Sequence, residues 1–299
     1  MSKRESLSRY NLIIKKLRKN PASFKEISEY LELESEIQGY DFTIGIRTFQ
    51  RDMDDILALY NVDIKYDHYL KAYKIVEDNQ PEVTERILEA FDTLNALNIS
   101  DRLSGYIHFE KRKPQGTENL YGLLHAIKKQ LQIKFIYNKF WDGVLSDRTV
   151  EPYALKEFKH RWYLIAKDLN DGQIKTFGLD RLTELDISKK FFLFPEEFDA
   201  NEHFKYCFGI MGPNAQAPEN IILSFNTVQA KYIKSLPLHE TQEIIEENET
   251  GILIKLKLYI TLDFIMELLS YGDSVEIVEP GDLREIMRGV YEKAMGRYL

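Results

Sequence analysis

The sequence predicts an α+β protein of several domains, because the spacing of its apolar residues changes along the chain. Apolar residues first recur at helical spacing, then alternate along short runs, and finally mix both patterns. With 299 residues, the chain is also longer than the roughly 100–200 residues of a usual domain. We therefore expect three modules at residues 1–78, 118–190 and 218–299, with linkers at residues 79–117 and 191–217.

The first module begins with three predicted helices, of which the third is the most regular. The first covers about Ser6–Arg18 and the second starts after Ser23. Thr43 is the expected N-cap of the third helix. The apolar residues of that helix fall at steps of three and four: Ile46, Phe49, Met53, Ile56 and Tyr60. This stripe turns four polar side chains near the helix N-terminus toward solvent: Arg47, Thr48, Gln50 and Arg51.

Residues 62–78 alternate like a β-hairpin, with Asp67-His68 near the turn. Three small helices and a hairpin form a winged helix-turn-helix, whose third helix enters the major groove of DNA with its N-terminal part. Arg and Gln side chains there reach base edges or phosphates. The candidate contacts to double-stranded DNA are Thr43, Arg47, Thr48, Gln50 and Arg51. The alternative is a three-helix module with solvated polar residues, because the module as a whole is not basic.

The charge of the chain is unevenly distributed. A net charge of −8 argues against a general binder of polyanions. Residues 1–20, however, carry seven Lys or Arg and one Glu, whereas residues 240–249 carry five Glu and no basic residue. This distribution permits a nucleic-acid-binding end on an acidic body, and we expect the basic first helix to add phosphate contacts.

A helical stretch that starts at Pro81 lies in the first linker. It has one continuous apolar face: Val83, Ile87, Ala90, Phe91, Leu94 and Leu97. The stretch is either a linker packed on the core or a helix of a dimer interface. We favour the dimer helix, because a module that reads a DNA groove usually engages two half-sites.

The second module predicts a short helix at Tyr121–Gln130 and several short antiparallel strands. The strand-like runs are residues 132–138, 148–158, 161–168, 173–179 and 182–188. They are separated by turn signals at Asp142-Gly143, Lys159-His160 and Asp171-Gly172. Several short strands in so short a segment imply a small barrel.

The run at residues 161–168 alternates between two faces of its strand. Trp162 and the apolar residues in phase with it belong in the core of the barrel. Arg161 and Tyr163 lie on the opposite face, where Arg181 can add a second guanidinium. Two arginines with aromatic residues suit an anionic ligand that stacks, such as a nucleotide or single-stranded nucleic acid. The alternative is a set of strand arginines that are simply solvated.

The third module is a small α+β unit after the linker-like stretch at residues 212–220, and it carries no chemical motif. The single cysteine and the six histidines do not fall at spacings that ligate a metal, and no phosphate-binding glycine loop or nucleophile elbow is present. No secretory signal and no apolar run of about 20 residues occur. We expect a cytoplasmic protein that is not an enzyme, with no catalytic residues, metal, cofactor or membrane association.

Three stretches of the sequence resemble one protein family. "RWYLIAKD", with "EPYAL" upstream and "TFGLDRL" downstream, resembles the WYL domain, and "IRTFQRDMDDI" followed by "DIKYDHYLKAYKI" resembles the winged helix that commonly precedes it. "LLSYGDSVEIVEPGDLREIMRGV" is similar to the C-terminal extension of the WCX type. The resemblance implies a bacterial transcriptional regulator, commonly a homodimer. It further implies a WYL domain folded as an Sm-like, SH3-type barrel that senses a ligand, and a ferredoxin-like C-terminal domain.

The resemblance also implies which residues bind the ligand. Carried over by motif, they are Tyr153, His160, Arg161, Tyr163, Asp180 and Arg181. One position departs from the pattern, because many members have Arg where this chain has Gly178. The resulting hypothesis is a DNA-binding regulator that responds to a nucleotide or single-stranded nucleic acid. The alternative is an adaptor that binds single strands and controls a partner enzyme, for instance in phage defence.

Overall fold

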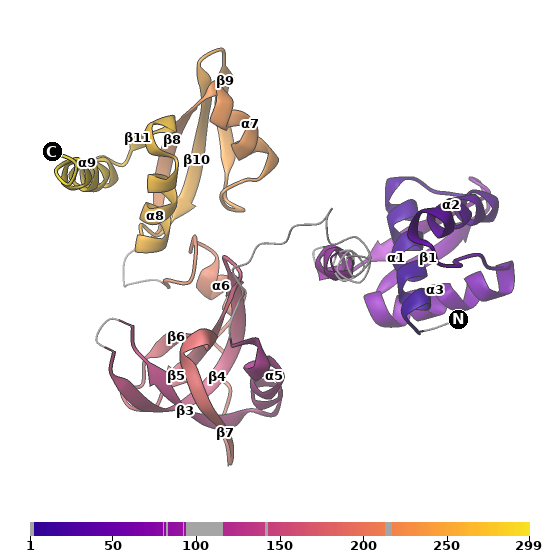
Figure 1. Cartoon of the computed structure of the whole chain (residues 1–299), viewed down its shortest axis with the longest axis horizontal. Helices are drawn as coiled ribbons and strands as arrows, with labels where there is room; N and C mark the ends of the chain where they lie inside the picture. Colours follow the sequence, from indigo (N-terminus) through magenta and orange to yellow (C-terminus); the bar gives the residue numbers. More distant parts are fainter. Residues whose placement is uncertain are drawn as a thin grey trace. The chain divides into compact units, whose positions relative to one another are not determined.

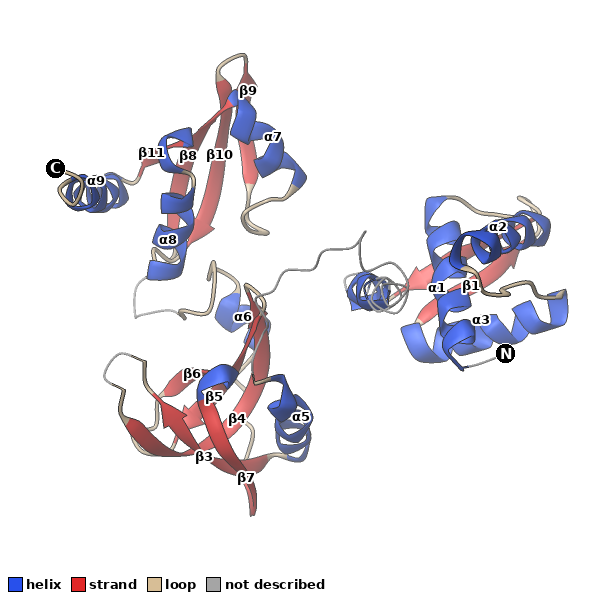
Figure 2. Ribbon diagram, viewed as in Figure 1, coloured by secondary structure: helices blue, strands red, loops and turns tan. Residues whose placement is uncertain are grey.

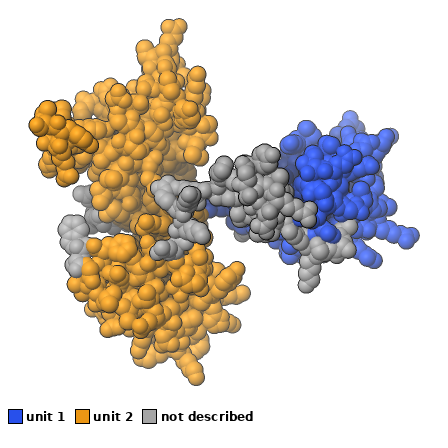
Figure 3. Space-filling view, in the orientation of Figure 1, with its two compact units in different colours: residues 1–111 blue, residues 112–299 orange. Residues whose placement is uncertain are grey.

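The computed structural model describes residues 3–79, 81, 83–91, 93, 116–140, 143–212 and 217–299. It divides into two compact units (Figure 1). Unit 1 comprises residues 1–111 and unit 2 comprises residues 112–299 (Figure 3). Among the helices of the described residues, none is long and apolar enough to cross a membrane.

Unit 1 contains the three predicted helices and the predicted hairpin. Its elements are α1 (Lys3–Lys19), α2 (Phe24–Gln38), α3 (Ile46–Tyr60), β1 (Val62–Asp67) and β2 (Ala72–Asp78), and β1 pairs with β2 in antiparallel orientation. The second helix begins after Ser23 as predicted, because Ser23 and Glu26 form a capping box. The Ser23 amide donates to Glu26 Oε2 at 2.7 Å, and the Glu26 amide donates to Ser23 Oγ at 3.3 Å. All five elements bury apolar side chains in one core.

The predicted N-cap of α3 is wrong. The N-cap is Gly45, and Thr43 lies two residues before it. The reason is a local competitor: the Asp41 carboxylate accepts hydrogen bonds from both the amide and the hydroxyl of Thr43. Phe42, which is fully buried, holds this turn against the core. The helix therefore starts later than its sequence pattern indicates.

Residues 83–91 are helical, and the face that they pack on the core of unit 1 is not the predicted apolar face. Thr84 and Leu88 are buried, and Leu88 joins the core of the unit. Val83, Ile87 and Ala90 of the predicted apolar face are exposed. Leu94 and Leu97, the other end of that face, lie outside the described residues. Within residues 83–91, the apolar stripe thus remains accessible to a partner.

The first part of unit 2 is a five-stranded antiparallel sheet with a helix against it (Figure 2). The short turn η1 (Thr117–Asn119) leads into helix α5 (Leu120–Lys129), and the strands are β3 (Leu131–Asn138), β4 (Leu145–Phe158), β5 (Arg161–Asp168), β6 (Ile174–Gly178) and β7 (Leu182–Phe191). The five predicted strands are all present, in the order β6-β5-β4-β3-β7. The predicted barrel is not closed. The edge strands β6 and β7 would have to pair to close it, and their described residues form no ladder. Instead, the turn η2 (Leu179–Arg181) follows β6 directly and buries Leu179 in the core.

Strand β5 is buried on both faces. Leu164 and Ala166 lie in the core with α5, and Trp162 packs against it, as predicted. On the opposite face, Ile165 packs with Phe204 and Cys207. These two residues come from the stretch that we predicted as a linker, which contains the short helix α6 (Ala200–Phe204). This stretch covers the face on which we expected side chains to meet a ligand.

The last part of unit 2 is a four-stranded sheet with the strand order β11-β8-β10-β9. Its elements are β8 (Glu219–Asn226), α7 (Thr227–Ser235), β9 (Glu243–Asn248), β10 (Gly251–Leu258), α8 (Leu262–Ser270), η3 (Gly272–Ser274), β11 (Val275–Glu279) and the terminal helix α9 (Gly281–Met295). This is the β-α-β-β-α-β chain order of a ferredoxin-like domain. At the start of β10, Gly251 has a φ of 152°, and a Cβ there would lie 1.9 Å from the carbonyl oxygen of Phe225. The hairpin between β9 and β10 therefore needs glycine at this position.

Candidate functional site

The start of α3 presents a polar face to solvent. Four side chains of its first two turns are exposed: Arg47, Thr48, Gln50 and Arg51. Phe49, which lies between them in the sequence, is fully buried in the core of unit 1. No side chain caps the helix at Gly45, and an uncapped helix N-terminus is favourable for a phosphate. The residues predicted to contact DNA on this helix therefore lie together and are accessible.

Helix α3 is held by three consecutive residues of α1. The pairs are Arg9 with Asp52, Tyr10 with Asp55, and Asn11 with Tyr60. The guanidinium of Arg9 donates from Nε and Nη2 to the two oxygens of Asp52 at 2.7 and 2.8 Å, and both side chains are only 3% exposed. A bidentate pair of this kind fixes direction as well as distance. The polar face of α3 is thus mounted on a rigid support.

We expected the basic residues of α1 to contact phosphates, but two of its arginines form ion pairs within unit 1. Arg9 is buried in its pair with Asp52, and Arg18 donates to Asp78 at 2.6 Å and lies 3.6 Å from Glu85. These two arginines are therefore occupied within unit 1. Phosphate contacts from α1 would therefore have to come from its other basic residues.

The turn between β1 and β2 is a candidate contact that the sequence reasoning did not single out. Tyr69 is 94% exposed, and its neighbours His68 and Lys71 are exposed as well. Asp67 shapes the turn, because its carboxylate accepts hydrogen bonds from the amides of Tyr69 and Leu70. Lys and Tyr side chains at a loop tip are suited to phosphate contacts. The available signal was the aromatic and basic composition of this turn.

In unit 2, the two arginines of the motif converge on one carboxylate. Arg161 donates from Nη1 to Asp180 Oδ2 at 3.0 Å, and Arg181 Nε lies 3.9 Å from Asp180 Oδ1. Arg161 is more than half exposed. The guanidinium carbon of Arg181 lies 5.2 Å from the ring centroids of both Tyr137 and Phe140. We name Arg161, Asp180 and Arg181 the motif edge.

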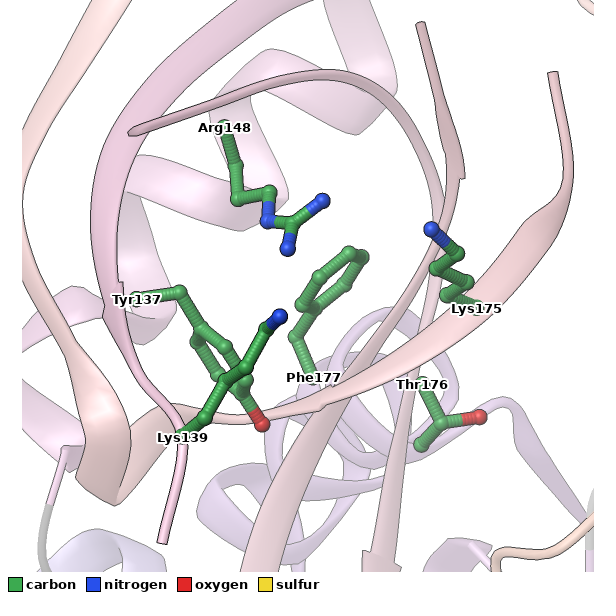
Figure 4. A pocket seen from close by; sticks show the side chains of 6 residues that line it. All are labelled: Tyr137, Lys139, Arg148, Lys175, Thr176 and Phe177. Atoms are coloured by element: carbon green, nitrogen blue, oxygen red, sulfur yellow. The ribbon is translucent and has the colours of Figure 1, made fainter. Parts of the chain in front are cut away.

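A pocket of about 390 Å³ opens among β3, β4 and β6 (Figure 4). Six residues line it: Tyr137, Lys139, Arg148, Lys175, Thr176 and Phe177. The guanidinium of Arg148 and the ammonium of Lys139 both point toward the ring of Phe177 (Figure 4). Tyr137 belongs to this pocket and also contacts Arg181, so the pocket lies next to the motif edge. We name it the cationic pocket.

Two of the pocket cations share one buried oxygen. Asp168 Oδ2 accepts from Arg148 Nη1 at 2.7 Å and from Lys175 Nζ at 2.8 Å, and Asp168 is 0% exposed. Lys175 also pairs with Asp171. Burial alone raises the pKa of a carboxyl, but hydrogen bonds from Lys175 and the Asn170 amide outweigh it and hold the pKa of Asp168 below its ordinary value. The ionised carboxylate therefore keeps both cations in place.

Two domain families match unit 2. Residues 118–187 match the family model of the WYL domain, and residues 217–295 match that of the WCX domain. The chain is a WYL-domain protein. The family expected from the sequence is therefore confirmed for unit 2, whereas neither family match covers unit 1.

Among the solved structures that the fold resembles are two remote likenesses. A structure of proteasome accessory factor B/C (PafBC) of Arthrobacter aurescens is 18% identical with a TM-score of 0.37, and the match covers 96% of this chain and 46% of that one. A CRISPR Cas-related protein is 13% identical with a TM-score of 0.39, and the match covers 97% of this chain and 92% of that one. No curated protein matches the chain. The assignment therefore rests on the two domain matches.

Within the WYL domain, not all of the residues carried over by motif lie at one place. Arg161, Asp180 and Arg181 meet, and His160 is exposed in the turn before Arg161. Tyr153, in contrast, is 5% exposed, and its ring packs against three phenylalanines: Phe192, Phe194 and Phe198. Tyr163 is also buried, which raises the pKa of its hydroxyl above the ordinary value. The environment of both tyrosines favours a packing role.

Gly178, the position that departs from the family pattern, leaves room for Arg181. A Cβ on Gly178 would lie 2.7 Å from Asp180 Oδ1 and 2.9 Å from Arg181 Nη2. A side chain at this position would therefore compete with the motif edge for space.

The cationic pocket was missed at the sequence level. Its cations follow β3 or belong to β4 and β6, so they are far apart in the chain. Only the pairing of β3 with β4, and of β5 with both β4 and β6, brings them together. The one local signal was Asp168 at the end of a strand otherwise rich in apolar residues, a charge that calls for a buried partner.

Proposed function

We propose that this protein is a DNA-binding transcriptional regulator of the WYL family, in which unit 1 reads double-stranded DNA as a winged helix-turn-helix. The observation that carries the proposal is the exposed face of Arg47, Thr48, Gln50 and Arg51 on a helix fixed by a buried ion pair. Guanidinium and amide side chains at the start of such a helix reach base edges in the major groove. The rigid attachment to α1 supports recognition of a defined sequence.

The WYL domain is proposed to sense an anionic effector, a nucleotide or a single-stranded nucleic acid. The motif edge offers two guanidinium groups to one carboxylate, which leaves an excess of positive charge. Guanidinium groups bind phosphate in a planar, two-point geometry and stack on aromatic rings. Binding of the effector is proposed to change the affinity of the regulator for DNA, without a chemical reaction.

The regulator is proposed to act as a homodimer through the stripe of Val83, Ile87 and Ala90. These side chains are exposed on residues 83–91, whereas Thr84 and Leu88 anchor that helix to unit 1. Ile87→Glu is expected to shift the protein from dimer to monomer, because a carboxylate would have to be buried in an apolar contact. Sedimentation velocity at the concentrations used for DNA binding measures the shift.

The matched control is Leu33→Glu, which places the same charge at an exposed apolar position of α2. It should sediment like the wild-type protein. A wild-type monomer, or an Ile87→Glu variant that remains dimeric, would rule out this interface.

The proposed function is tested by fluorescence anisotropy on duplex DNA from the region upstream of the protein's own coding sequence, at fixed salt. We expect tight binding to one duplex over a scrambled duplex of equal length. A short single strand should alter this binding in the wild-type protein and fail to do so in Arg161→Ala/Arg181→Ala. Binding of single strands without any preference for a duplex would contradict the proposal and favour an adaptor.

A further inference from the structure

Within the part of the chain that the structure describes, the cationic pocket has more cations than ion-pair partners. Arg148 and Lys175 are held by Asp168, and Lys175 also pairs with Asp171. Lys139 forms no ion pair with any residue that the structure describes. The lining thus brings three cations together with two carboxylates. Among the described residues, ion pairs account for Arg148 and Lys175 but not for Lys139, whose ammonium points into the same space (Figure 4).

The hydrogen-bonding groups of the pocket are only partly used. Arg148 donates from Nε to Ser146 Oγ at 3.3 Å and from Nη1 to Asp168. Its Nη2 has no acceptor among the described residues. Arginine carries five N–H donors and lysine three, so donors remain for a ligand on both Arg148 and Lys139. Because the buried Asp168 fixes Arg148, these donors are oriented before a ligand arrives.

The floor of the pocket is aromatic rather than polar. Phe177 and Tyr137 meet edge to face with ring centroids 5.1 Å apart, and the two residues are only 3% and 7% exposed. The hydroxyl of Tyr137 accepts from the Gly178 amide at 3.2 Å. The floor therefore offers an apolar surface, beside which charge-assisted hydrogen bonds are stronger than in open water.

An exposed aromatic ring lies beside the pocket. Phe140 is 64% exposed and follows Lys139 directly. The Arg181 guanidinium lies at equal distance from the rings of Phe140 and Tyr137, so it connects the pocket with this ring. A flat, uncharged group can stack on Phe140 or Arg181 while an anion occupies the pocket.

We propose that the cationic pocket binds the phosphate of a nucleotide, with the base against Phe140 and Arg181. The proposal rests on the proposed function in taking the WYL domain as the sensor, but it moves the anchor of the effector from the motif edge to Lys139 and Arg148. A phosphate monoester carries a charge of about −1.5 to −2 and several acceptor oxygens, which suits several cations better than a carboxylate does. The pocket volume of about 390 Å³ lies near the lower end of small-molecule sites, so one nucleotide fits and a folded nucleic acid does not.

The test uses isothermal titration calorimetry on the full chain with four kinds of probe. They are the four nucleoside 5′-monophosphates, the matching nucleosides, inorganic phosphate, and short single strands with and without a 5′-phosphate. We expect the phosphorylated nucleotide to bind at least about tenfold more tightly than the nucleoside or inorganic phosphate. Binding of the monophosphates identifies a free nucleotide as the source, and binding of only the 5′-phosphorylated strand identifies a strand end.

Three variants locate the site. Lys139→Gln and Arg148→Gln should each weaken binding about tenfold, because each removes a charged donor to the phosphate. Lys134→Gln, which removes an exposed cation of β3 outside the pocket, should leave binding unchanged. Lys139→Gln breaks no ion pair with a described residue, so it remains informative if Arg148→Gln disturbs Asp168.

Three results would overturn the inference: no binding of any phosphorylated probe by the wild-type protein, unchanged binding in Lys139→Gln, or an equal loss in Lys134→Gln. Inorganic phosphate that binds as tightly as the nucleotides would overturn the part that concerns the base. Duplex binding measured in parallel separates the two proposals. A protein that binds its duplex but no nucleotide contradicts only the pocket, whereas one that binds nucleotide but no duplex contradicts only the regulator.

Discussion

Asp52→Ala is expected to destabilise unit 1 by about 3–5 kcal/mol, the usual cost of removing one partner of a buried ion pair while the other charge stays buried. Arg9 and Asp52 are both 3% exposed and are joined by two hydrogen bonds of 2.7 and 2.8 Å. With Asp52 replaced, the guanidinium of Arg9 loses both bonds and cannot reach water without opening the core. A loss of this size is a large part of the roughly 5–15 kcal/mol that stabilises a native protein. Binding to duplex DNA should fall with it.

The distribution of tryptophan makes the effect easy to localise. Residues 1–111 of unit 1 contain no tryptophan and Trp162 lies in β5 of unit 2, so tryptophan fluorescence does not report the unfolding of unit 1. Helical circular dichroism follows both units. In Asp52→Ala, the dichroism should show an early transition at lower denaturant while the fluorescence transition stays in place. The midpoints of the two transitions are the quantities to compare.

The control is Asp54→Ala, which removes an exposed carboxylate from the same helix. It should leave both transitions within about 0.5 kcal/mol of the wild-type protein. An Asp52→Ala variant that unfolds like this control would show that the pair between α1 and α3 contributes little. The support proposed for the polar face of α3 would then have to come from elsewhere.

Asp52 also shows where sequence reasoning stops. The helical stripe of α3 could be predicted, because apolar residues at steps of three and four are a local pattern. A buried aspartate in that helix could not, because its partner lies 43 residues earlier in the chain. The N-cap failed for the opposite reason, since Asp41, only two residues away, captures Thr43. Local rules predicted that a helix forms here, but not that it starts at Gly45 instead of Thr43.

In unit 2, the strands could be predicted and their surroundings could not. Alternation placed Trp162 toward the core correctly. The same alternation placed Tyr163 at a ligand, but Tyr163 is buried, and its neighbour Ile165 is covered by Phe204. Covering of a second face depends on a segment some forty residues away, which a period-two pattern does not report. The convergence of Arg161 and Arg181 on Asp180 likewise required the pairing of β5 with β6.

Arg47→Ala/Arg51→Ala is expected to lower the affinity for the specific duplex by at least about 30-fold, because each arginine in a groove contributes roughly 1–3 kcal/mol. Both side chains are exposed, so the fold of unit 1 should not change. A contact to a base edge and a contact to a phosphate have different signatures. Loss of a base contact lowers binding to the specific duplex more than to a scrambled one, whereas loss of a phosphate contact weakens both and reduces the salt dependence.

The matched control is Lys25→Ala/Arg288→Ala, which removes the same charge from exposed positions of α2 and α9. If charge alone drove binding, this control would lose as much affinity as the α3 variant. Such a result would contradict recognition by α3. With a net charge of −8, the protein as a whole does not attract DNA, so tight binding must come from specific contacts. Anisotropy titrations of both variants at two salt concentrations, on the specific and the scrambled duplex, separate these cases. A loss confined to the α3 variant and larger on the specific duplex would assign Arg47 and Arg51 to sequence readout.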